Sequence, residues 1–485
     1  MGEYLSPGVY TEDLSSNSVI IEGVATSIAG FVGISKRGDA SAPVYITSWT
    51  DFKKKFAYGM DSPFYKNSYL AFEVYSFFNN QGTKCYIQRV GTSKLAKASA
   101  KVMDSTNTST VLLNLSAKDE GAWGNSLKVK CTANADVTTS FDVTVTYGTD
   151  SEVFEQLVND ESDEKYFLDY INMNSNYIKV LSGDKISVFA EVSFTGGDDG
   201  EDGVTDSDYL TALSKFDGVD DCTLICVPGQ TSDAMLTGIC DYIDNHKYQF
   251  AALDAPMAFT TTEIKALRKK LSCKRAVLLD TWHKINDPLS NVNGKYRSIP
   301  SSGAYLGVAA RTIESIGPWK APAGTDAKLN GAIELVFSAQ KGDTDILNPA
   351  GVVSIINKAN YGNIVWGARC ITPNSQYKYV SDVLLDIYIK KSVEEGTQSL
   401  VFDPNKTTLW NKIIVSCESF LDKLWRDGGL KGDTAKEAYY VKCDKELNPD
   451  EVKDLGECIT EIGYASAKPA EFIVFRFTNK VPTSA

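Results

Sequence analysis

The sequence contains only two histidines, His246 and His283, and none of the short motifs that mark common catalytic sites. A Walker loop, a Gly-x-Gly-x-x-Gly turn, a His-Glu-x-x-His zinc motif and a Gly-x-Ser-x-Gly turn are all missing. A histidine-based general base therefore has two candidates at most. The sequence predicts no catalytic site, no cofactor and no bound metal.

Long apolar runs are also missing. No run reaches the roughly 18 apolar residues that a membrane helix needs, and Met1–Pro7 lacks the basic and apolar regions of a signal peptide. We therefore expect a protein that is made and kept in a cytoplasm, without membrane insertion. The ten cysteines agree with this, because they stand singly in apolar runs as free core thiols do. Cys222 and Cys226 are close, but they lack the further ligands of a metal site.

A basic stripe is missing as well. The net charge is −13, of which −7 falls in Asp150–Tyr170 and −6 in Asp198–Asp208. An acidic chain without a basic stripe is a poor nucleic-acid binder, so we expect no nucleic-acid partner. The acidic runs predict solvated, outward-facing surface. The second run contains four closely spaced acids that could hold calcium: Asp198, Asp199, Glu201 and Asp202. A calcium site is disfavoured, because these acids lack the alternating spacing of a calcium loop.

The N-terminal part reads as a strand–helix–strand unit. A buried strand is predicted at Ile28–Ile34, a helix at Lys66–Asn80 with Gly82 as its C-cap, and a second strand at Cys85–Val90. A chain of 485 residues is long enough for two to four domains, each with its own core.

Short strands with polar turns follow, and they predict a small β-sandwich between about Lys97 and Gly196. The expected strands are Thr110–Leu115, Ser126–Cys131, Phe141–Tyr147 and Tyr177–Leu181. The run Gly196–Gly200 reads as a hinge-like linker.

Strands and helices then alternate, which predicts a parallel α/β sheet. The expected strands are Cys222–Val227, Gln249–Leu253 and Arg275–Leu279, and the expected helices are Thr231–His246, Thr262–Leu271 with a threonine cap, and Ser302–Ile316.

The last part reads as α+β. It contains an amphipathic helix at Thr407–Trp425, strands at Ala438–Cys443 and Glu457–Tyr464, and a terminal strand at Glu471–Lys480. A shorter strand begins at Ser6 near the other end of the chain. A strand at an extreme end of a chain is free to pair with another subunit.

One acid–base pair is conceivable. Asp280 and His283 follow a predicted strand, where ligands bind in parallel α/β sheets. This pattern leaves an α/β hydrolase as an alternative function, although no activated serine or cysteine is evident beside the pair. A loop after a buried strand is the favoured interpretation.

A set of motifs in a fixed order resembles the tail sheath proteins of contractile-tailed bacteriophages and phage-tail-like particles. The motifs are Pro7–Tyr10, Gly121–Asn125, Gly196–Gly197, Arg311, Gly317–Gly324, Leu347–Val352, Val365–Arg369, Phe402–Asn405, Val441–Asp444 and Pro469–Phe472. The resemblance implies a discontinuous core, an inserted β-sandwich, a subtilisin-like α/β domain without a catalytic triad, and terminal β-arms. The implied parts are 1–24 (arm and linker), 25–96 (core), 97–197 (sandwich), 198–355 (subtilisin-like), 356–468 (C-terminal core) and 469–485 (arm).

The resemblance also implies a structural role and no enzyme. Subunits of this family form stacked hexameric rings around an inner tail tube, with baseplate and tail-terminator proteins at the ends, and the polymer contracts to drive the tube into a target cell envelope. Localisation in a virion tail or phage-tail-like particle, assembled in a bacterial host cytoplasm, follows. A static, non-contractile tube is the remaining alternative.

Two residue sets carry these expectations. By resemblance, strand donation to neighbouring subunits falls on Gly8, Val9, Tyr10, Thr11, Phe472, Val474, Phe475 and Phe477. The polar face of the helix Thr407–Trp425 and the loop after it are expected to face the tube through Lys412, Lys423, Arg426 and Lys431. Exposed ion pairs each contribute only about 0–1 kcal/mol, which suits a contact between sheath and tube that must dissociate during contraction.

Overall fold

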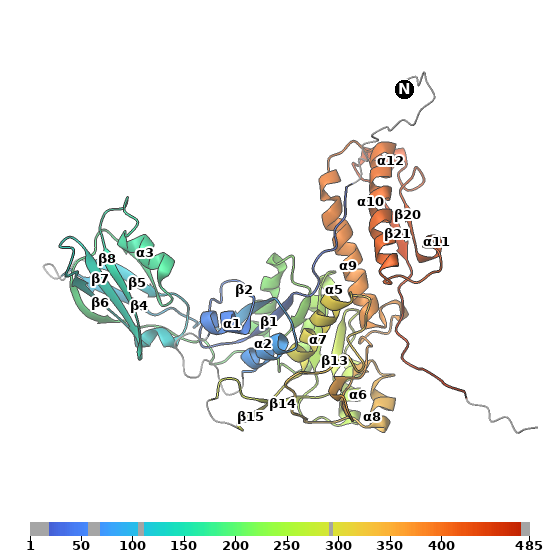
Figure 1. Cartoon of the computed structure of the whole chain (residues 1–485), viewed down its shortest axis with the longest axis horizontal. Coiled ribbons are helices and arrows are strands. Elements are labelled where there is room, and N and C mark those ends of the chain that lie inside the picture. The colour runs from blue at the N-terminus through green and yellow to red at the C-terminus, as the bar shows by residue number, and fades with distance from the viewer. Residues whose placement is uncertain (1–18, 57–67, 105–110, 291–293, 477–485) are drawn as a thin grey trace, which may run out of the picture. The chain divides into compact units, whose positions relative to one another are not determined.

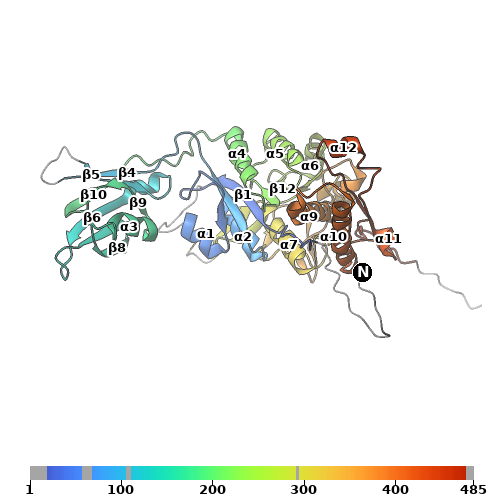
Figure 2. The ribbon, with the colours of Figure 1, turned by 90° about the horizontal axis from the view of Figure 1, so that it is seen from above.

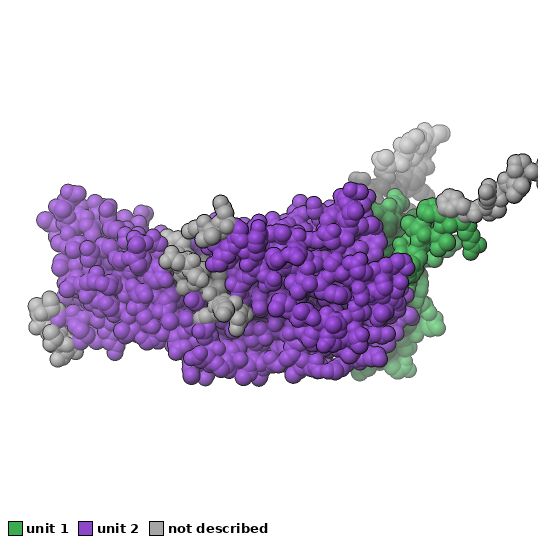
Figure 3. Space-filling view, turned by 90° about the horizontal axis from the view of Figure 1, so that it is seen from below, with its two compact units in different colours: residues 1–24, 385–485 green, residues 25–384 purple. Residues whose placement is uncertain are grey.

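The computed structural model describes residues 19–56, 68–104, 111–290 and 294–476. The chain divides into two compact units (Figure 3). Unit 1 comprises Met1–Val24 and Leu385–Ala485, and unit 2 comprises Ala25–Leu384. Each unit is described by itself below.

Unit 2 is built on a seven-stranded sheet. Its order is β17 (Val352–Val353), β13 (Ala276–Leu279), β12 (Phe250–Asp254), β11 (Leu224–Cys226), β1 (Ala29–Ile34), β3 (Cys85–Val90) and β2 (Val44–Ile46). All neighbours are parallel except β3 and β2, which are antiparallel. Every residue of β11, β12 and β13 is buried, as expected for parallel strands covered on both faces. The predicted mixed α/β architecture is confirmed.

Helices cover both faces of this sheet (Figure 2). One face carries α4 (Asp206–Leu213), α5 (Asp233–Asn245) and α6 (Thr261–Lys270), whose apolar residues share one core with the strands. The other carries α2 (Leu70–Asn79) and α7 (Ser302–Ser315), with α1 (Trp49–Phe56) nearby. The predicted threonine cap is present, because Thr260 and Glu263 form a capping box at the start of α6.

Helix α2 differs from its prediction at both ends. It begins at Leu70 rather than Lys66, and Lys66 itself lies outside the described residues. At its C-terminal end the left-handed residue is Gln81, with φ 70°, so Gly82 is not the left-handed cap. A Cβ on Gly82 would lie 2.3 Å from the Phe77 ring. The glycine is therefore needed for close packing.

The β-sandwich predicted between Lys97 and Gly196 is present (Figure 1). One sheet contains β4 (Ser99–Met103), β5 (Val111–Ala117) and β9 (Ile178–Gly183); the other contains β10 (Phe189–Ser193), β6 (Leu127–Ala133), β7 (Phe141–Tyr147) and β8 (Asp150–Leu157). Both sheets contribute to one hydrophobic core, with α3 (Phe167–Asn174) and the short helix η1 (Ala122–Ser126) packed on it.

The prediction of a hinge-like linker at Gly196–Gly200 is wrong. This segment runs antiparallel to the segment that enters the sandwich, with Ala96 bridged to Asp198 and Ser99 bridged to Thr195. The Thr92 amide also donates to the Gly200 carbonyl oxygen at 2.8 Å. Two hydrogen-bonded segments form a stiffer connection than two independent linkers would.

The rest of unit 2 consists of small elements that the sequence did not reveal. They are η2 (Ser214–Gly218), a three-stranded sheet of β15 (Tyr296–Ile299), β14 (His283–Asn286) and β16 (Glu334–Leu335), helix α8 (Lys341–Leu347), the hairpin of β18 (Ile355–Lys358) and β19 (Gly362–Val365), and η3 (Ser375–Tyr377).

Unit 1 contains two long helices and a small sheet. The elements are the end of α9 (Val380–Thr397), η4 (Gln398–Leu400), α10 (Thr407–Arg426), α11 (Ala435–Ala438), β20 (Tyr439–Lys442), α12 (Asp450–Asp454) and β21 (Glu461–Tyr464). The predicted helix and both internal strands are confirmed, whereas α9 was not predicted. The segment before unit 2 is anchored here, because the amides of Val19 and Val24 donate to the hydroxyls of Ser416 and Ser392.

Candidate functional site

The carboxyl end of the unit 2 sheet carries a buried polar cluster rather than an open site. The Asp254 carboxylate, on the last residue of β12, accepts hydrogen bonds from the amides of Ser301 (3.0 Å) and Ser302 (2.9 Å) and from the Ser302 hydroxyl (2.6 Å). Glu73 of α2 accepts from the Gly303 amide at 2.6 Å. Two of the chain's own carboxylates therefore occupy the N-terminus of α7, the place where helices commonly bind anions.

Burial makes both carboxyl groups of this cluster weaker acids. Burial raises the pKa of Glu73 well above its ordinary value, and the neighbouring Asp254 adds to the effect. Burial raises the pKa of Asp254 to about 6, although its hydrogen bonds act in the opposite direction. Asp254 and both serines are less than a tenth exposed, so a substrate could not reach them without opening the core.

The predicted acid–base pair of Asp280 and His283 is not formed. The Asp280 carboxylate accepts from the Ile355 amide at 3.0 Å, whereas His283 Nδ1 lies 3.0 Å from the Ser301 hydroxyl. No hydrogen bond joins the two side chains in the part of the chain that the structure describes. Burial lowers the pKa of His283 to about 4 and raises that of Asp280 to about 7. The serine beside His283 was missed in the sequence because 18 positions separate the two residues.

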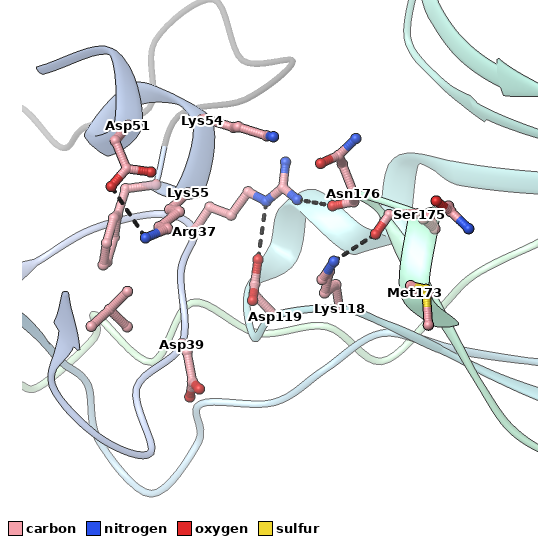
Figure 4. Close-up of a pocket in the computed structure, with 13 residues that line it drawn as sticks. Arg37, Asp39, Asp51, Lys54, Lys55, Lys118, Asp119, Met173, Ser175 and Asn176 are labelled. Carbon is pink, nitrogen blue, oxygen red and sulfur yellow. Dashed lines mark hydrogen bonds and ion pairs between the residues drawn. The ribbon is translucent and has the colours of Figure 1, made fainter. Parts of the chain in front are cut away.

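A cleft of about 480 Å³ lies between the core of unit 2 and the sandwich (Figure 4). Its charged side chains mostly satisfy one another: Arg37 Nε lies 3.3 Å from Asp119, Lys55 Nζ lies 3.2 Å from Asp51, and Lys118 Nζ donates to the Ser175 carbonyl oxygen at 2.6 Å. The polar side chains of the cleft thus connect the core of unit 2 to the sandwich. Its mixed charge gives no basic patch for an anion.

The Asp198–Asp208 acids likewise make internal contacts. Asp199 accepts from the Ala122 amide at 2.8 Å, and Asp208 belongs to the capping box of α4 with Thr205. The described residues contain no group of three or more His, Cys, Asp or Glu side chains arranged to hold a metal ion. None of their helices is both long and apolar enough to cross a bilayer.

Large apolar side chains of unit 1 lie in water. Phe402 is fully exposed, at 101%, and its backbone is left-handed with φ 73°. The loop that carries it is well tied, because Asn405 donates to the Glu457 carbonyl oxygen at 2.7 Å and accepts from the Trp410 indole at 2.8 Å. Leu455 is also 76% exposed. Exposing these side chains to water does not stabilise a single folded subunit.

Among the described residues, the longest run of consecutive exposed large apolar side chains lies in the C-terminal segment. Phe472, Ile473, Val474 and Phe475 are each about three-quarters exposed, and the last strand among the described residues ends at Tyr464. The structure assigns no strand to residues 471–476, and the rest of the strand predicted at Glu471–Lys480 lies outside the described residues. The remaining predicted arm residues lie outside the described residues; they are Gly8, Val9, Tyr10, Thr11 and Phe477.

The predicted tube-facing residues differ in their surroundings. Lys412 is held by Asp403 at 3.2 Å and is only 31% exposed, and Arg426 is paired with Asp422 at 2.8 Å. Lys423 and Lys431 are exposed. Nearby, β20 and β21 form a sheet of only two strands in the described part of unit 1.

Comparison with known proteins gives a consistent result. The model of the phage tail sheath protein central domain matches residues 202–371, and that of the phage tail sheath C-terminal domain matches residues 372–480, together more than half of the chain. A comparison with curated proteins gives no match.

Solved structures show the same fold over nearly the whole chain. The sheath of an extracellular contractile injection system, PVC, in its contracted state is 20% identical, with 99% of each chain covered and a TM-score of 0.63. The contracted helical sheath of the anti-feeding prophage is 19% identical, with 99% of this chain and 100% of that chain covered and a TM-score of 0.60. A sheath tail protein from Listeria innocua is 13% identical, with 92% and 96% covered and a TM-score of 0.63. The chain belongs to the phage tail sheath protein family.

Proposed function

We propose that this sheath subunit polymerises as stacked hexameric rings around an inner tail tube and that the polymer contracts to drive the tube into a target envelope. The observation that carries the proposal is the exposed apolar run Phe472–Phe475 at the end of a polymer-forming family member. Exposing such a run is costly for a monomer and useful for a subunit that pairs with another. The resolved relatives include sheaths in the contracted state, which supports a contractile rather than a static tube.

The terminal arms are assigned to strand donation. An extended terminal segment adds to an open sheet edge through main-chain hydrogen bonds, while alternate side chains enter the receiving core. The sheet of β20 and β21 is the receiver we favour, because two strands alone are marginally stable in water and its edges can accept further strands. The N-terminal arm, with Gly8–Thr11, is given the same role.

The domain layout follows the family resemblance. We assign residues 97–197 to the insertion, 198–355 to the subtilisin-like domain, 25–96 and 356–468 to the core, and 1–24 and 469–485 to the arms. Strands β1, β2 and β3 of residues 25–96 share one sheet with β11, β12 and β13 of residues 198–355. The buried cluster around Asp254 fits a scaffold, because the chain's own carboxylates fill the α7 N-terminus. The proposed partners are the inner tube, the baseplate and tail-terminator proteins, in a phage tail or phage-tail-like particle assembled in a bacterial cytoplasm.

The arms are tested by charge insertion. Ile473→Asp with Phe475→Asp should leave a folded subunit and abolish tube formation in negative-stain micrographs, because aspartate disfavours the strand and its buried face. Val188→Asp is the matched control, since Val188 is a half-exposed apolar residue of the sandwich. Normal tubes from the double variant would refute strand donation by the C-terminal arm.

Removal of residues 1–17 tests the N-terminal arm in the same assay. The segment Val19–Val24, which is anchored on α9 and α10, stays intact in this truncation. The expected outcome is a soluble subunit with unchanged cooperative unfolding that no longer forms contractile sheaths. Normal assembly by the truncated subunit would rule out the role of this arm.

A further inference from the structure

Two cysteines of unit 1, Cys443 and Cys458, lie close together just beyond the paired ends of β20 and β21. The Sγ atoms of Cys443 and Cys458 are 3.9 Å apart. Lys442 of β20 pairs with Glu461 of β21, and extending this antiparallel register places Cys443 and Cys458 as diagonal neighbours on one face. Both are free thiols.

The surrounding structure holds the two thiols together. The Asn448 side chain donates to the Ile459 carbonyl oxygen at 2.9 Å and accepts from the Ile459 amide at 2.6 Å. The same Nδ2 group lies 3.7 Å from Cys443 Sγ. Asn448 is fully buried, so the chain beside Cys458 is fixed next to Cys443.

Access distinguishes this pair from the other cysteines. Cys458 is half-buried, whereas the other nine cysteines are buried. Cys240 and Cys273 also interact, but both lie inside the core of unit 2. Cys458 is therefore more accessible to an oxidant from solution than either cysteine of the Cys240–Cys273 pair.

We propose that Cys443 and Cys458 form an oxidation site, at which a low-molecular-weight disulfide converts the two thiols into an intramolecular disulfide. With oxidised glutathione, the Cys458 thiolate attacks one glutathione sulfur, a mixed disulfide forms and one glutathione thiol leaves. The Cys443 thiolate then attacks the Cys458 sulfur and displaces the second glutathione thiol. Two protein thiols are oxidised and one glutathione disulfide is reduced to two thiols, which take up the two protons.

The bond would close the loop 444–457, which carries α12, and would connect the end of β20 to the chain that enters β21. Cross-linking this loop restricts the unfolded chain, so the oxidised subunit should melt at a higher temperature than the reduced subunit. The sulfurs, 3.9 Å apart in the reduced subunit, must approach to about 2.0 Å, which requires rotation of both side chains and a small movement of the chain at Cys458.

The test uses the full-length protein, purified reduced and then incubated with excess oxidised glutathione. Burial and the neighbouring Cys443 raise the pKa of Cys458 to about 11, so the buffer is made alkaline to increase the small fraction of thiolate. Remaining thiols are alkylated in denaturant. Trypsin then cuts after Lys445 and Lys453, so a disulfide appears as two linked peptides that separate on reduction.

The expected result is one linkage, between Cys443 and Cys458, and a higher melting temperature that returns to the reduced value with a reductant. Cys458→Ser should remove both effects, and Cys417→Ala, which changes another cysteine of the same unit, should remove neither. A glutathione adduct that stays on Cys458 while Cys443 remains alkylatable would overturn the proposal. So would complete alkylation of both thiols, or a linkage that involves other cysteines.

Discussion

The guanidinium group of Arg37 stacks on the indole ring of Trp123, 4.1 Å from the ring centroid, and joins the core of unit 2 to the sandwich. The same group pairs with Asp119 and donates to the Asn176 carbonyl oxygen. Gly121 allows the approach, because a Cβ there would lie 2.4 Å from the Lys36 carbonyl oxygen. Arg37 is 2% exposed. We therefore infer that the insertion is held by a buried arginine joint and is not loosely tethered.

Replacing Arg37 tests this joint. Arg37→Ala leaves Asp119 without its cation and removes the stacking on Trp123, so we expect a loss of about 2–4 kcal/mol in the free energy of unfolding. Segments 92–97 and 196–200 should become sensitive to limited proteolysis. Lys54→Ala is the control, because Lys54 lines the same cleft but is exposed. Equal stability and protease resistance in the two variants would show that the joint does not depend on Arg37.

The buried carboxyl groups predict how stability depends on pH. Burial raises the pKa of Asp280 to about 7 and that of Asp254 to about 6, whereas an unfolded carboxyl titrates near about 4. Between about pH 4 and 7 the folded state thus binds more protons than the unfolded state. The two carboxyl groups should therefore increase the free energy of unfolding of unit 2 as the pH falls from about 8 to about 5, by at most about 1.4 kcal/mol per group and pH unit. Buried His283, whose folded pKa is lowered to about 4, opposes this increase below about pH 6.5.

The contribution of Asp280 can be isolated with Asp280→Asn, which keeps an oxygen acceptor for the Ile355 amide. Urea unfolding at several pH values should give a smaller slope for this variant than for the unchanged protein. Asp345→Asn, at a side chain that is 63% exposed, should keep the full slope. An unchanged slope in Asp280→Asn would mean that Asp280 is already charged below neutral pH.

Elements with a simple apolar pattern could be predicted from the sequence. Strand β13 and all of β12 except Asp254 are apolar, both strands are completely buried, and α10 has one apolar face. Their types and approximate bounds were therefore predicted correctly. Strand β8 was missed because Asp150 and Glu155 are exposed acidic residues and a bulge interrupts the alternation of the strand. At that bulge Gln156 is left-handed, with φ 59°, and its amide donates to Asp142.

Features that depend on tertiary contacts could not be predicted. Helix α9 buries charged as well as apolar side chains, including Asp382, Asp386 and Lys391, so its sequence shows no single apolar face. The Cys443–Cys458 pair and the His283–Ser301 pair each join residues that are 15 or more positions apart. Their proximity follows from strand pairing and loop closure, which no local pattern records.

The exposure of Phe402 leads us to expect that its replacement affects the assembly of subunits but not the stability of a single subunit. A fully exposed phenylalanine in a left-handed conformation does not stabilise its own subunit. Phe402→Asn should therefore leave the melting temperature unchanged or slightly raised, because asparagine tolerates this conformation. If Phe402 packs on a neighbouring subunit in the sheath, the variant should need a higher protein concentration to form tubes.

The control for Phe402 is Val188→Asn, which removes a half-exposed apolar side chain from the sandwich. Sedimentation of assembled tubes over a concentration series measures the effect of each variant. A lower melting temperature for Phe402→Asn would show that the side chain stabilises its own subunit. An unchanged assembly threshold would show that Phe402 has no role between subunits.

The final prediction concerns the polar face of α10 and the loop after it. Lys412 is a poor probe of the tube contact, because reversing its charge would also break its ion pair with Asp403. Lys423 and Lys431 are exposed, so Lys423→Glu with Lys431→Glu changes the surface charge and little else. If this surface faces the tube, the double variant should assemble poorly on purified tubes and should still polymerise without them.

The matched control is Lys436→Glu, an exposed lysine of α11 in the same unit. Because exposed ion pairs contribute about 0–1 kcal/mol each, the effect should weaken as salt is raised. Co-sedimentation with tubes at low and high salt therefore measures the contact directly. If assembly is lost equally with and without tubes, Lys423 and Lys431 contact neighbouring sheath subunits. If neither kind of assembly changes, the two lysines contact neither the tube nor another sheath subunit.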